Sequence, residues 1–315
     1  MKYLFGPVQS RRLGRSLGID LLPGKICNLN CIYCEVGRIT SMDCTRKQYS
    51  PTAEILAEID RFLADPAKVD TTDVFTLTAS GEPTLHSDLG RIVTHLKSHT
   101  EKPVAILTNG ALLYRSDVQN ELMDIDIVIP SLDSARPESF RKINRPAACN
   151  ESIEGIIEGL RSFSTQYQGK FWLEILLAEG VNNSAADIQA LRKAAGLIQP
   201  DKIQLNTVVR PPAEKTARPL TPAELRNTAQ LFDCPVEIIV SLTQDRFEKF
   251  HAFDQNEVLN MLRRRPCTLE EICKALSLDP ADAENEIIKL EKENLIHRTT
   301  HNDRRYYQTK KPETV

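Results

Sequence analysis

Three cysteines lie close together near the beginning of the chain, at a spacing of CxxxCxxC. They are Cys27, Cys31 and Cys34. Three thiolates at such short range can hold three irons of a cubane 4Fe–4S cluster, which normally takes four cysteines. Without a fourth cysteine, one iron keeps an open position for a substrate or a cofactor. The spacing therefore predicts a cluster with a reactive corner.

A structural zinc site is the alternative for this group of thiols, because zinc takes four tetrahedral ligands, usually from CxxC pairs. Cys44 offers a fourth ligand, so the number of cysteines does not exclude zinc. The chain has no second CxxC pair, however, and apolar or aromatic residues stand between the thiols, namely Leu29, Ile32 and Tyr33. We therefore favour the iron–sulfur interpretation.

The chain has 315 residues, of which 41% are hydrophobic and 26% charged, and a net charge of −3. This composition is that of an ordinary soluble globular protein, long enough for one large domain and a small one. The overall charge argues against binding polyanions by bulk electrostatics. Residues 1–50, with 8 Lys/Arg against 3 Asp/Glu, nevertheless carry a local excess of +5 around the cysteines.

The sequence predicts a cytoplasmic protein. No apolar stretch approaches the roughly 18 residues that span a bilayer, and the first residues lack the apolar core of a secretion signal. Eight cysteines in such a chain predict reduced thiols or metal ligands rather than disulfides. Cys234 and Cys273 stand in apolar patterns and are expected in the core. Cys44 and Cys149 stand in polar loops and remain candidate ligands of a second cluster or of a substrate.

From residue 17 to about 241, short apolar runs alternate with amphipathic helical stretches, which is typical of βα units and a parallel sheet. The fold class is therefore α/β, with a partial (β/α)6 barrel over residues 1–243. The predicted strands are 18–22, 73–78, 104–107, 125–129, 171–177 and 203–209. The predicted helices are 52–64, 85–97, 152–163 and 184–197.

Polar residues on one face of the last two predicted strands suggest a site inside the barrel. Trp172 and Glu174 share one face of their strand, and Gln204 and Asn206 share one face of the next. The interior of a barrel otherwise prefers branched aliphatic residues. We expect Glu174 and Asn206 to face the lumen; the alternative is a sheet edge that faces water.

The pattern changes beyond residue 243. Short helices are predicted over 256–265 and 268–276, a third helix begins at Asp279, and a hairpin follows over 295–308. Thr268 and Glu271 form a capping box. Residues 254–309 resemble a winged helix, and 310–315 are expected to be disordered.

The aromatic residue before the third cysteine makes the first motif recognisable. CxxxC followed by an aromatic residue and Cys resembles the cluster motif of the radical S-adenosylmethionine (SAM) enzymes. In barrels of parallel strands, reactive residues gather at the carboxyl ends of the strands. Three further segments stand there and resemble family segments: SGEP at 80–83 is similar to GGEP, TNG at 108–110 to TNG, and SLD at 131–133 to a polar segment after the fourth strand.

The resemblance implies SAM contacts at these segments. In the family, GGEP binds the amino group of the SAM methionine, TNG lies near the methionine and ribose, and the third segment reaches the ribose hydroxyls or the carboxylate. A turn or a helix cap is the structural alternative for each segment. Ser80 replaces the first glycine of GGEP, so that position should have ordinary backbone angles. The implied cofactor residues are Ser80, Gly81, Glu82, Thr108, Asn109, Ser131 and Asp133.

Residues 7–20 and 34–38 look like the subgroup of radical SAM oxidoreductases that is related to the wyosine-synthesis enzymes of tRNA. The chain lacks the second-cluster cysteines of the wyosine enzymes, which argues against wyosine chemistry itself. The resemblance implies that SAM binds the open iron and is cleaved reductively to methionine and a 5′-deoxyadenosyl radical, which takes a hydrogen atom from a substrate. Reduced ferredoxin or flavodoxin is the expected electron donor. No catalytic side chain is assigned.

Four arginines near the cysteines favour a phosphate-bearing substrate, because guanidinium binds phosphate with two hydrogen bonds. They are Arg11, Arg12, Arg15 and Arg38. The alternative is that they pair with carboxylates of the acidic middle of the chain or with SAM itself.

The charges of the C-terminal residues argue against DNA binding. The third helix of a winged helix normally reads DNA, and here its acidic residues outnumber Lys289 and Lys292. Three functions stay open: modification of a tRNA or nucleotide, modification of a peptide or protein (glycyl-radical activation included), and a non-catalytic iron–sulfur sensor.

Overall fold

The computed structural model describes residues 1–39, 42–78, 80–148, 152–239 and 253–309. Its main element is an eight-stranded sheet with the strands in chain order. The strands are β1 (Leu4–Ser10), β2 (Gly14–Asp20), β3 (Val74–Thr78), β4 (Val104–Thr108), β5 (Ile127–Pro130), β6 (Lys170–Leu177), β7 (Lys202–Thr207) and β8 (Val236–Ile238). The strand β1 is antiparallel to β2, and the strands from β2 to β8 are parallel. Because β1 and β8 are the two edges, the barrel is open.

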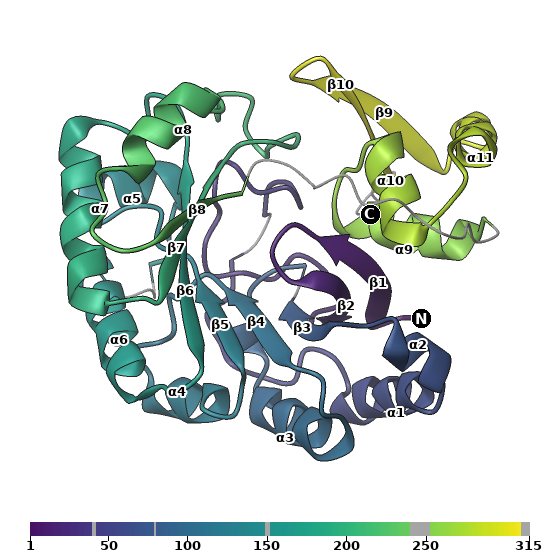
Figure 1. The fold of residues 1–315 in the computed structure, drawn as a ribbon, viewed down its shortest axis with the longest axis horizontal. Coiled ribbons are helices and arrows are strands. Elements are labelled where there is room, and N and C mark those ends of the chain that lie inside the picture. Colours follow the sequence, from purple (N-terminus) through teal and green to yellow (C-terminus); the bar gives the residue numbers. More distant parts are fainter. Residues whose placement is uncertain (40–41, 79, 149–151, 240–252, 310–315) are drawn as a thin grey trace.

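Helices cover the outer face of the curved sheet (Figure 1). They are α1 (Thr52–Leu63), α2 (Pro66–Asp70), the 3-10 turn η1 (Pro83–Leu85), α3 (Leu89–His99), α4 (Ser116–Leu122), α5 (Pro137–Ile143), α6 (Ile153–Gln166), α7 (Ala185–Ile198) and α8 (Pro222–Ala229). The main core lies between helices and sheet and includes the fully buried Phe75, Ile92 and Phe163. Among the described residues, no helix has both the length and the apolar character that a membrane crossing requires.

All six predicted strands exist, but the sequence interpretation missed both edges of the sheet. β1 was not predicted because Gly6-Pro7 interrupts it; proline is tolerated there because β1 is an edge strand with an irregular register between Phe5 and Val8. β8 has only three residues, and α2, α4, α5 and α8 are short. The first strand was predicted over 18–22, whereas β2 begins at Gly14. The glycine and the serine in its first half interrupt the apolar pattern on which the prediction relied. The helix predicted from residue 85 begins at Leu89, after η1.

The lumen holds the predicted polar layer. The Asn206 side-chain amide donates to Glu174 Oε1 over 3.2 Å, and Arg12 forms an ion pair with the same carboxylate. A layer of Val74, Ala105 and other aliphatic residues fills the lumen below. Glu174 and Asn206 therefore face the lumen, as predicted.

The C-terminal elements follow the predicted order of three helices and a hairpin. They are α9 (Gln255–Arg264), α10 (Leu269–Leu276), α11 (Pro280–Lys292), β9 (Ile296–His301) and β10 (Arg304–Thr309). The capping box of Thr268 and Glu271 is present. A second apolar core joins these elements, which we call the C-terminal module. The proposed boundary near residue 243 and the tail 310–315 lie outside the described residues.

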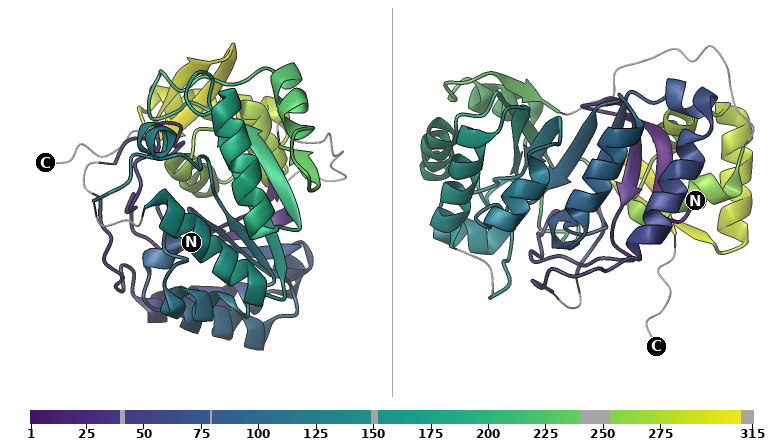
Figure 2. Two further views of the ribbon diagram at one scale, coloured as in Figure 1. Left: turned by 90° about the vertical axis from the view of Figure 1, so that its left-hand side faces the viewer. Right: turned by 90° about the horizontal axis from the view of Figure 1, so that it is seen from below.

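The C-terminal module packs against β1 at the edge of the sheet (Figure 2). The buried guanidinium of Arg210, which follows β7, donates to Glu35 beside the third cysteine (3.1 Å) and to Glu271 on α10 (2.6 Å). Arg264 Nε lies 3.3 Å from Asp20 Oδ2 at the end of β2. One arginine thus joins the cysteine loop, the barrel and the module.

Replacing Arg210 should destabilise this junction. We expect Arg210→Met to lower the free energy of unfolding by about 3 kcal/mol, because Glu35 and Glu271 lose their buried partner. The exposed pair of Arg218 and Glu179 provides the control, and Arg218→Met should cost about 0.5 kcal/mol or less. Urea unfolding measures both values, and equal effects would contradict the role given to Arg210.

Candidate metal centre

The three cysteines lie in a loop at the carboxyl end of β2. All three thiols are free and half-buried. Backbone hydrogen bonds fix the loop: Asn30 N donates to Asn144 O, and Ile32 N donates to Ile143 O, both over 2.9 Å. The loop is therefore held from the region after α5 as well as from the sheet.

The spacing of the sulfur atoms fits a cluster better than a single metal ion. One tetrahedral zinc with Zn–S bonds of about 2.3 Å needs sulfurs roughly 3.8 Å apart. The sulfurs of Cys27, Cys31 and Cys34 do not all lie within 4.8 Å of one another. In a 4Fe–4S cluster each thiolate binds a different iron, so wider separation is required. The donor set therefore fits the cubane.

Amide groups point at two of the sulfurs. Asn109 Nδ2 lies 3.6 Å from Cys27 Sγ, and Asn144 Nδ2 lies 3.4 Å from Cys31 Sγ. Burial raises the pKa of Cys27 to about 12 and raises that of Cys31 as well, while these hydrogen bonds favour thiolates. Without a metal the thiols are protonated, so cluster binding must release protons.

The segment after β3 packs directly on the cysteine loop. Glu82 N donates to Ile26 O over 2.9 Å. A Cβ on Gly81 would lie 1.7 Å from the same carbonyl oxygen, so only glycine fits there. Ser80 donates from N (3.0 Å) and from Oγ (2.7 Å) to the carboxylate of Asp20. Ser80 has no positive φ, in agreement with the expectation of ordinary backbone angles.

The buried carboxylate of Glu82 ties β3 to the end of β4. It accepts from the Thr84 backbone and hydroxyl (3.0 and 2.6 Å), from the Thr108 hydroxyl (2.6 Å) and from Asn109 N (2.6 Å). Burial raises the pKa of Glu82 and these donors oppose the shift. Three donors share Oε1 and one uses Oε2, so Oε2 keeps capacity for a further donor.

A second buried carboxylate, that of Asp133, follows β5 and joins it to the cysteine loop and to β6. Its carboxylate accepts from the Tyr33 hydroxyl, from Asn144 Nδ2 (2.7 Å) and from Leu176 N (3.0 Å). Burial raises the pKa of Asp133 to about 6, so the group is largely ionised at neutral pH. Ser131 N donates to Thr108 O over 2.9 Å. Asp133 thus positions Tyr33 and the amide that faces Cys31.

The structure brings all seven predicted cofactor residues to one end of the barrel, around the cysteine loop. The sequence interpretation assigned no positioning role to Asp20, Asn144 or Arg210, and it used Tyr33 as part of the motif without expecting its hydrogen bond to Asp133. Tyr33 stands inside the cysteine motif and offered the only local signal. The others lie in ordinary strand-end and loop segments, where no pattern distinguishes them.

The other cysteines that the structure describes do not join the group. Cys273 is buried in the core of the C-terminal module and Cys234 packs against the main core, as expected. Cys44 is disulfide-bonded. The expectation of reduced thiols alone is therefore wrong at Cys44, and Cys44 is not free to be a fourth ligand. Cys149 lies outside the described residues.

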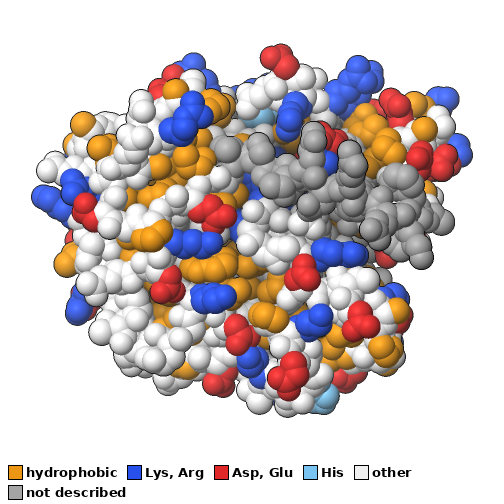
Figure 3. Space-filling model, in the orientation of Figure 1, with side chains coloured by type: hydrophobic (Ala, Val, Ile, Leu, Met, Phe, Trp, Pro, Cys, Tyr) orange, Lys and Arg blue, Asp and Glu red, His pale blue; other side chains and the backbone are white. Residues whose placement is uncertain are grey.

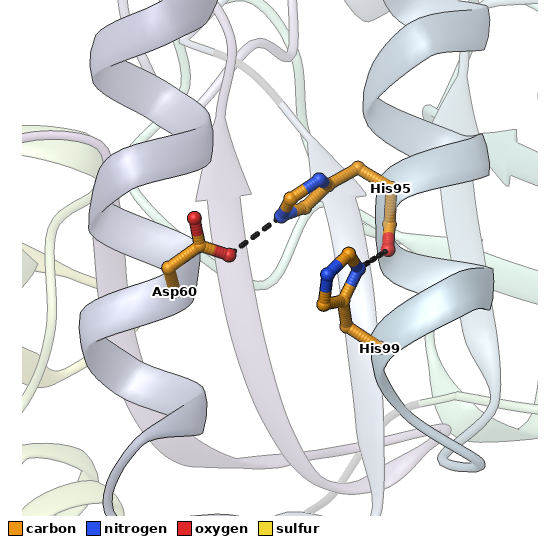
Figure 4. Close-up of side chains that lie close together, drawn as sticks. All are labelled: Asp60, His95 and His99. Carbon is orange, nitrogen blue, oxygen red and sulfur yellow. Dashed lines mark hydrogen bonds and ion pairs between the residues drawn. The ribbon is translucent and has the colours of Figure 1, made fainter.

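A second group with metal-ligand chemistry lies on the outer helices α1 and α3 (Figure 4). His95 Nε2 of α3 lies 2.6 Å from Asp60 Oδ1 of α1, and the ring of His99 stacks on His95. The sequence interpretation weighed zinc on the premise that the chain has no HxxxH pair, and this premise is wrong, because His95 and His99 form one. Its described bonds join α1 to α3.

A cavity of about 360 Å³ opens beside the cysteine loop. Tyr33 and Cys34 line it from the loop, and Glu174 and Asn206 line it from the lumen. α9 and α10 of the C-terminal module form another wall. A volume of this size accommodates a small organic molecule.

The sequence of the chain has relatives among known proteins. Residues 21–191 match the sequence model of the Radical SAM superfamily. A protein of Brachyspira hyodysenteriae named GTPase Obg is 33% identical over 92% of this chain, but this chain spans only 42% of that protein. A UPF0026 protein of Helicobacter pylori (strain J99) is 34% identical over 279 residues, 88% of each chain.

The fold also has relatives among solved structures. The crystal structure of a radical SAM methyltransferase from Sphaerobacter thermophilus superposes with a TM-score of 0.55 at 17% identity, over 71% of this chain and 65% of that one. At this identity the likeness shows the barrel fold and nothing of the reaction.

The close contact at Gly81 makes a specific prediction about metal binding. We expect Gly81→Ala to bind less than about half of the wild-type iron after anaerobic reconstitution, because the new Cβ displaces the Ile26 carbonyl and the loop that follows. Gly24 lies in the cysteine loop itself, and a Cβ there would have no atom within 4 Å, so Gly24→Ala should bind iron normally. Iron analysis and visible absorption give the result; normal iron in Gly81→Ala would show that the contact does not position the loop.

Proposed function

Because the chain belongs to the radical SAM superfamily and is a relative of the UPF0026 proteins, we propose that it is an enzyme that abstracts a hydrogen atom from a substrate held in the barrel. Superfamily members use a 4Fe–4S cluster and SAM. When bound, these groups supply an electron and a sulfonium whose reductive cleavage gives methionine and a 5′-deoxyadenosyl radical. The chain supplies binding, orientation and a cavity that excludes water.

The observation that carries this proposal is the set of three thiols without a fourth. Cys27, Cys31 and Cys34 have free, separated sulfurs, while Cys44 is disulfide-bonded. Such a set leaves one iron without a protein ligand, and that position is where SAM would bind. A non-catalytic sensor has no need of this open position or of the adjoining cavity.

The strand ends would hold the cofactor on this iron. We assign the seven residues that surround the loop to the SAM site. Some of them would contact SAM directly, and others would hold neighbouring groups in position. The carboxylate of Asp133 and most of that of Glu82 are already satisfied by protein donors, so these two groups chiefly hold other groups in place. The free acceptor capacity of Glu82 Oε2 and the backbone of residues 80–82 suit the ammonium group of methionine. The direct contacts would then come from Glu82 Oε2 and from Ser80, Gly81, Thr108, Asn109 and Ser131, whereas Asp133 would act through the groups that it holds.

The substrate would lie in the cavity, where Glu174, Arg12 and Asn206 form a hydrogen-bonded group at its lumen side. These side chains can orient polar atoms of a substrate, and no general base is required for hydrogen-atom abstraction. A nucleotide, free or within tRNA, is the substrate that the basic N-terminal segment favours. Reduced ferredoxin or flavodoxin would deliver the electron, and the reaction would take place in the cytoplasm.

The cleavage of SAM can be measured directly. We expect the anaerobically reconstituted protein to form 5′-deoxyadenosine and methionine from SAM in the presence of dithionite, and Cys31→Ala to lose at least about two orders of magnitude of this activity. Cys234→Ala, which removes a thiol that stands outside the cysteine motif and packs against the main core, should retain it. Liquid chromatography with mass spectrometry quantifies both products.

Two results would end the proposal. One is a purified protein that contains zinc instead of iron. The other is 5′-deoxyadenosine formation that Cys31→Ala leaves intact.

A further inference from the structure

The cavity beside the cysteine loop is not formed by the barrel alone. Met261, Arg264 and Arg265 at the end of α9, and Glu271 and Lys274 on α10, complete its wall. The barrel contributes the turn between β1 and β2 and the carboxyl ends of β6 and β7. A molecule in this cavity therefore contacts the C-terminal module as well as the barrel.

The charges that line the cavity do not balance. Its cationic side chains are Arg11, Arg12, Arg210, Arg264, Arg265 and Lys274, and its anionic side chains are Asp20, Glu35, Glu174 and Glu271. These are six cations and four anions, and because Lys274 pairs with Glu270 outside the cavity, the net excess is one positive charge. Over the face drawn in Figure 3, in contrast, basic and acidic side chains are interspersed.

Ion pairs show which residues carry the excess. Arg12 pairs with Glu174, Arg264 with Asp20, and Arg210 with both Glu35 and Glu271. Lys274 pairs with Glu270 outside the cavity. Neither the Arg11 nor the Arg265 guanidinium has a hydrogen bond or an ion pair with any residue that the structure describes. These two arginines are the cationic side chains of the cavity that have no ion-pair partner among the described residues.

Arg11 and Arg265 both lie near Glu35, the residue after Cys34. Arg11, Arg265 and Glu35 line the same cavity, and Arg210 Nη1 donates to both carboxylate oxygens of Glu35, over 3.1 and 3.2 Å. Burial and the neighbouring Arg210 lower the pKa of Arg11 to about 10. The positive charges therefore crowd one carboxylate that Arg210 already engages, and a further anion would relieve their repulsion.

Arg210 adds a third donor. Its guanidinium is 97% buried by side-chain exposure, and its Nε has no hydrogen-bond partner among the described residues. A buried N–H without an acceptor is costly, and a ligand oxygen in the cavity would satisfy it.

We propose that Arg11 and Arg265, with Arg210 Nε beside them, bind the phosphate group of a small phosphorylated substrate. This inference rests on the proposed function and names the class of its substrate. A phosphate monoester presents three strong acceptor oxygens and close to two negative charges at neutral pH, so it can engage both unpaired guanidinium groups at once. Guanidinium groups bind phosphate oxygens in pairs. The volume of about 360 Å³ between barrel and module fits a small molecule rather than a folded RNA.

The arrangement also gives the C-terminal module a role. Arg265 comes from the module and Arg11 from the turn between β1 and β2, so the phosphate site is complete only when the two parts are in contact. The phosphate would lie beside the cysteine loop, with the remainder of the substrate directed along the cavity toward Tyr33, Glu174 and Asn206. The module is thus part of the substrate site.

The test is the binding of inorganic phosphate to the full chain with its cluster reconstituted, measured by isothermal titration calorimetry at constant ionic strength. We expect saturable binding that weakens about tenfold or more in Arg11→Gln and in Arg265→Gln. Arg263→Gln is the matched control. Arg263 lies in the last turn of α9, two residues before Arg265, but it is exposed and does not line the cavity. Thermal unfolding of each variant verifies that it is folded.

Each other outcome overturns the inference. Equal phosphate binding by wild type, Arg265→Gln and Arg263→Gln would indicate a site elsewhere, and acetate bound as tightly as phosphate would indicate a carboxylate site. Loss of SAM binding in Arg265→Gln would assign the arginine to the cofactor. Displacement of phosphate by tRNA but not by ribose 5-phosphate would indicate a nucleic-acid substrate. Phosphate binding is independent of 5′-deoxyadenosine formation, so a failure of the proposed function is recognised separately.

Discussion

The site depends on two buried carboxylates, Glu82 and Asp133, and on the donors that surround them. A carboxylate removed from water must be satisfied by hydrogen bonds. Glu82 obtains them from the ends of β3 and β4, and Asp133 obtains them from Tyr33, Asn144 and the backbone of β6. Among these donors, Tyr33 stands inside the cysteine motif, and the side-chain amides of Asn109 and Asn144 face Cys27 and Cys31. The hydrogen bonds that satisfy the two buried carboxylates therefore also hold the cysteine loop in place.

The open side of the barrel creates a second constraint. An exposed edge strand invites pairing with other chains, and α9 and α10 of the C-terminal module pack on β1. The same contact places Glu271 against Arg210, and Arg210 against Glu35 beside Cys34. Protection of the edge, enclosure of the cavity and support of the cysteine loop therefore depend on one interface. A barrel of this kind without the module would lack a wall of its cavity.

The departure from the superfamily pattern at Ser80 has a local explanation. The Ser80 hydroxyl binds Asp20 at the end of β2, and Asp20 in turn lies 3.3 Å from Arg264 of the module. A glycine could not form this bond. The serine therefore extends the network from the cofactor segment to the C-terminal module, which is consistent with a substrate site that both parts build. Fold alone does not identify a reaction, and in this protein the side chains of the cavity carry that information.

The sequence by itself determined the features that are encoded locally. The cysteine spacing, the alternation of strands and helices, the polar face of β6 and β7 and the capping box at Thr268 each involve residues that are neighbours in the chain. Tertiary structure alone decided which polar groups meet. Arg210 reaches Glu35 across 175 positions, and Asn144 reaches Cys31 across 113. Such contacts are set by how the sheet curves and how the module packs on its edge, because burial, rather than local spacing, determines which charges must find a partner.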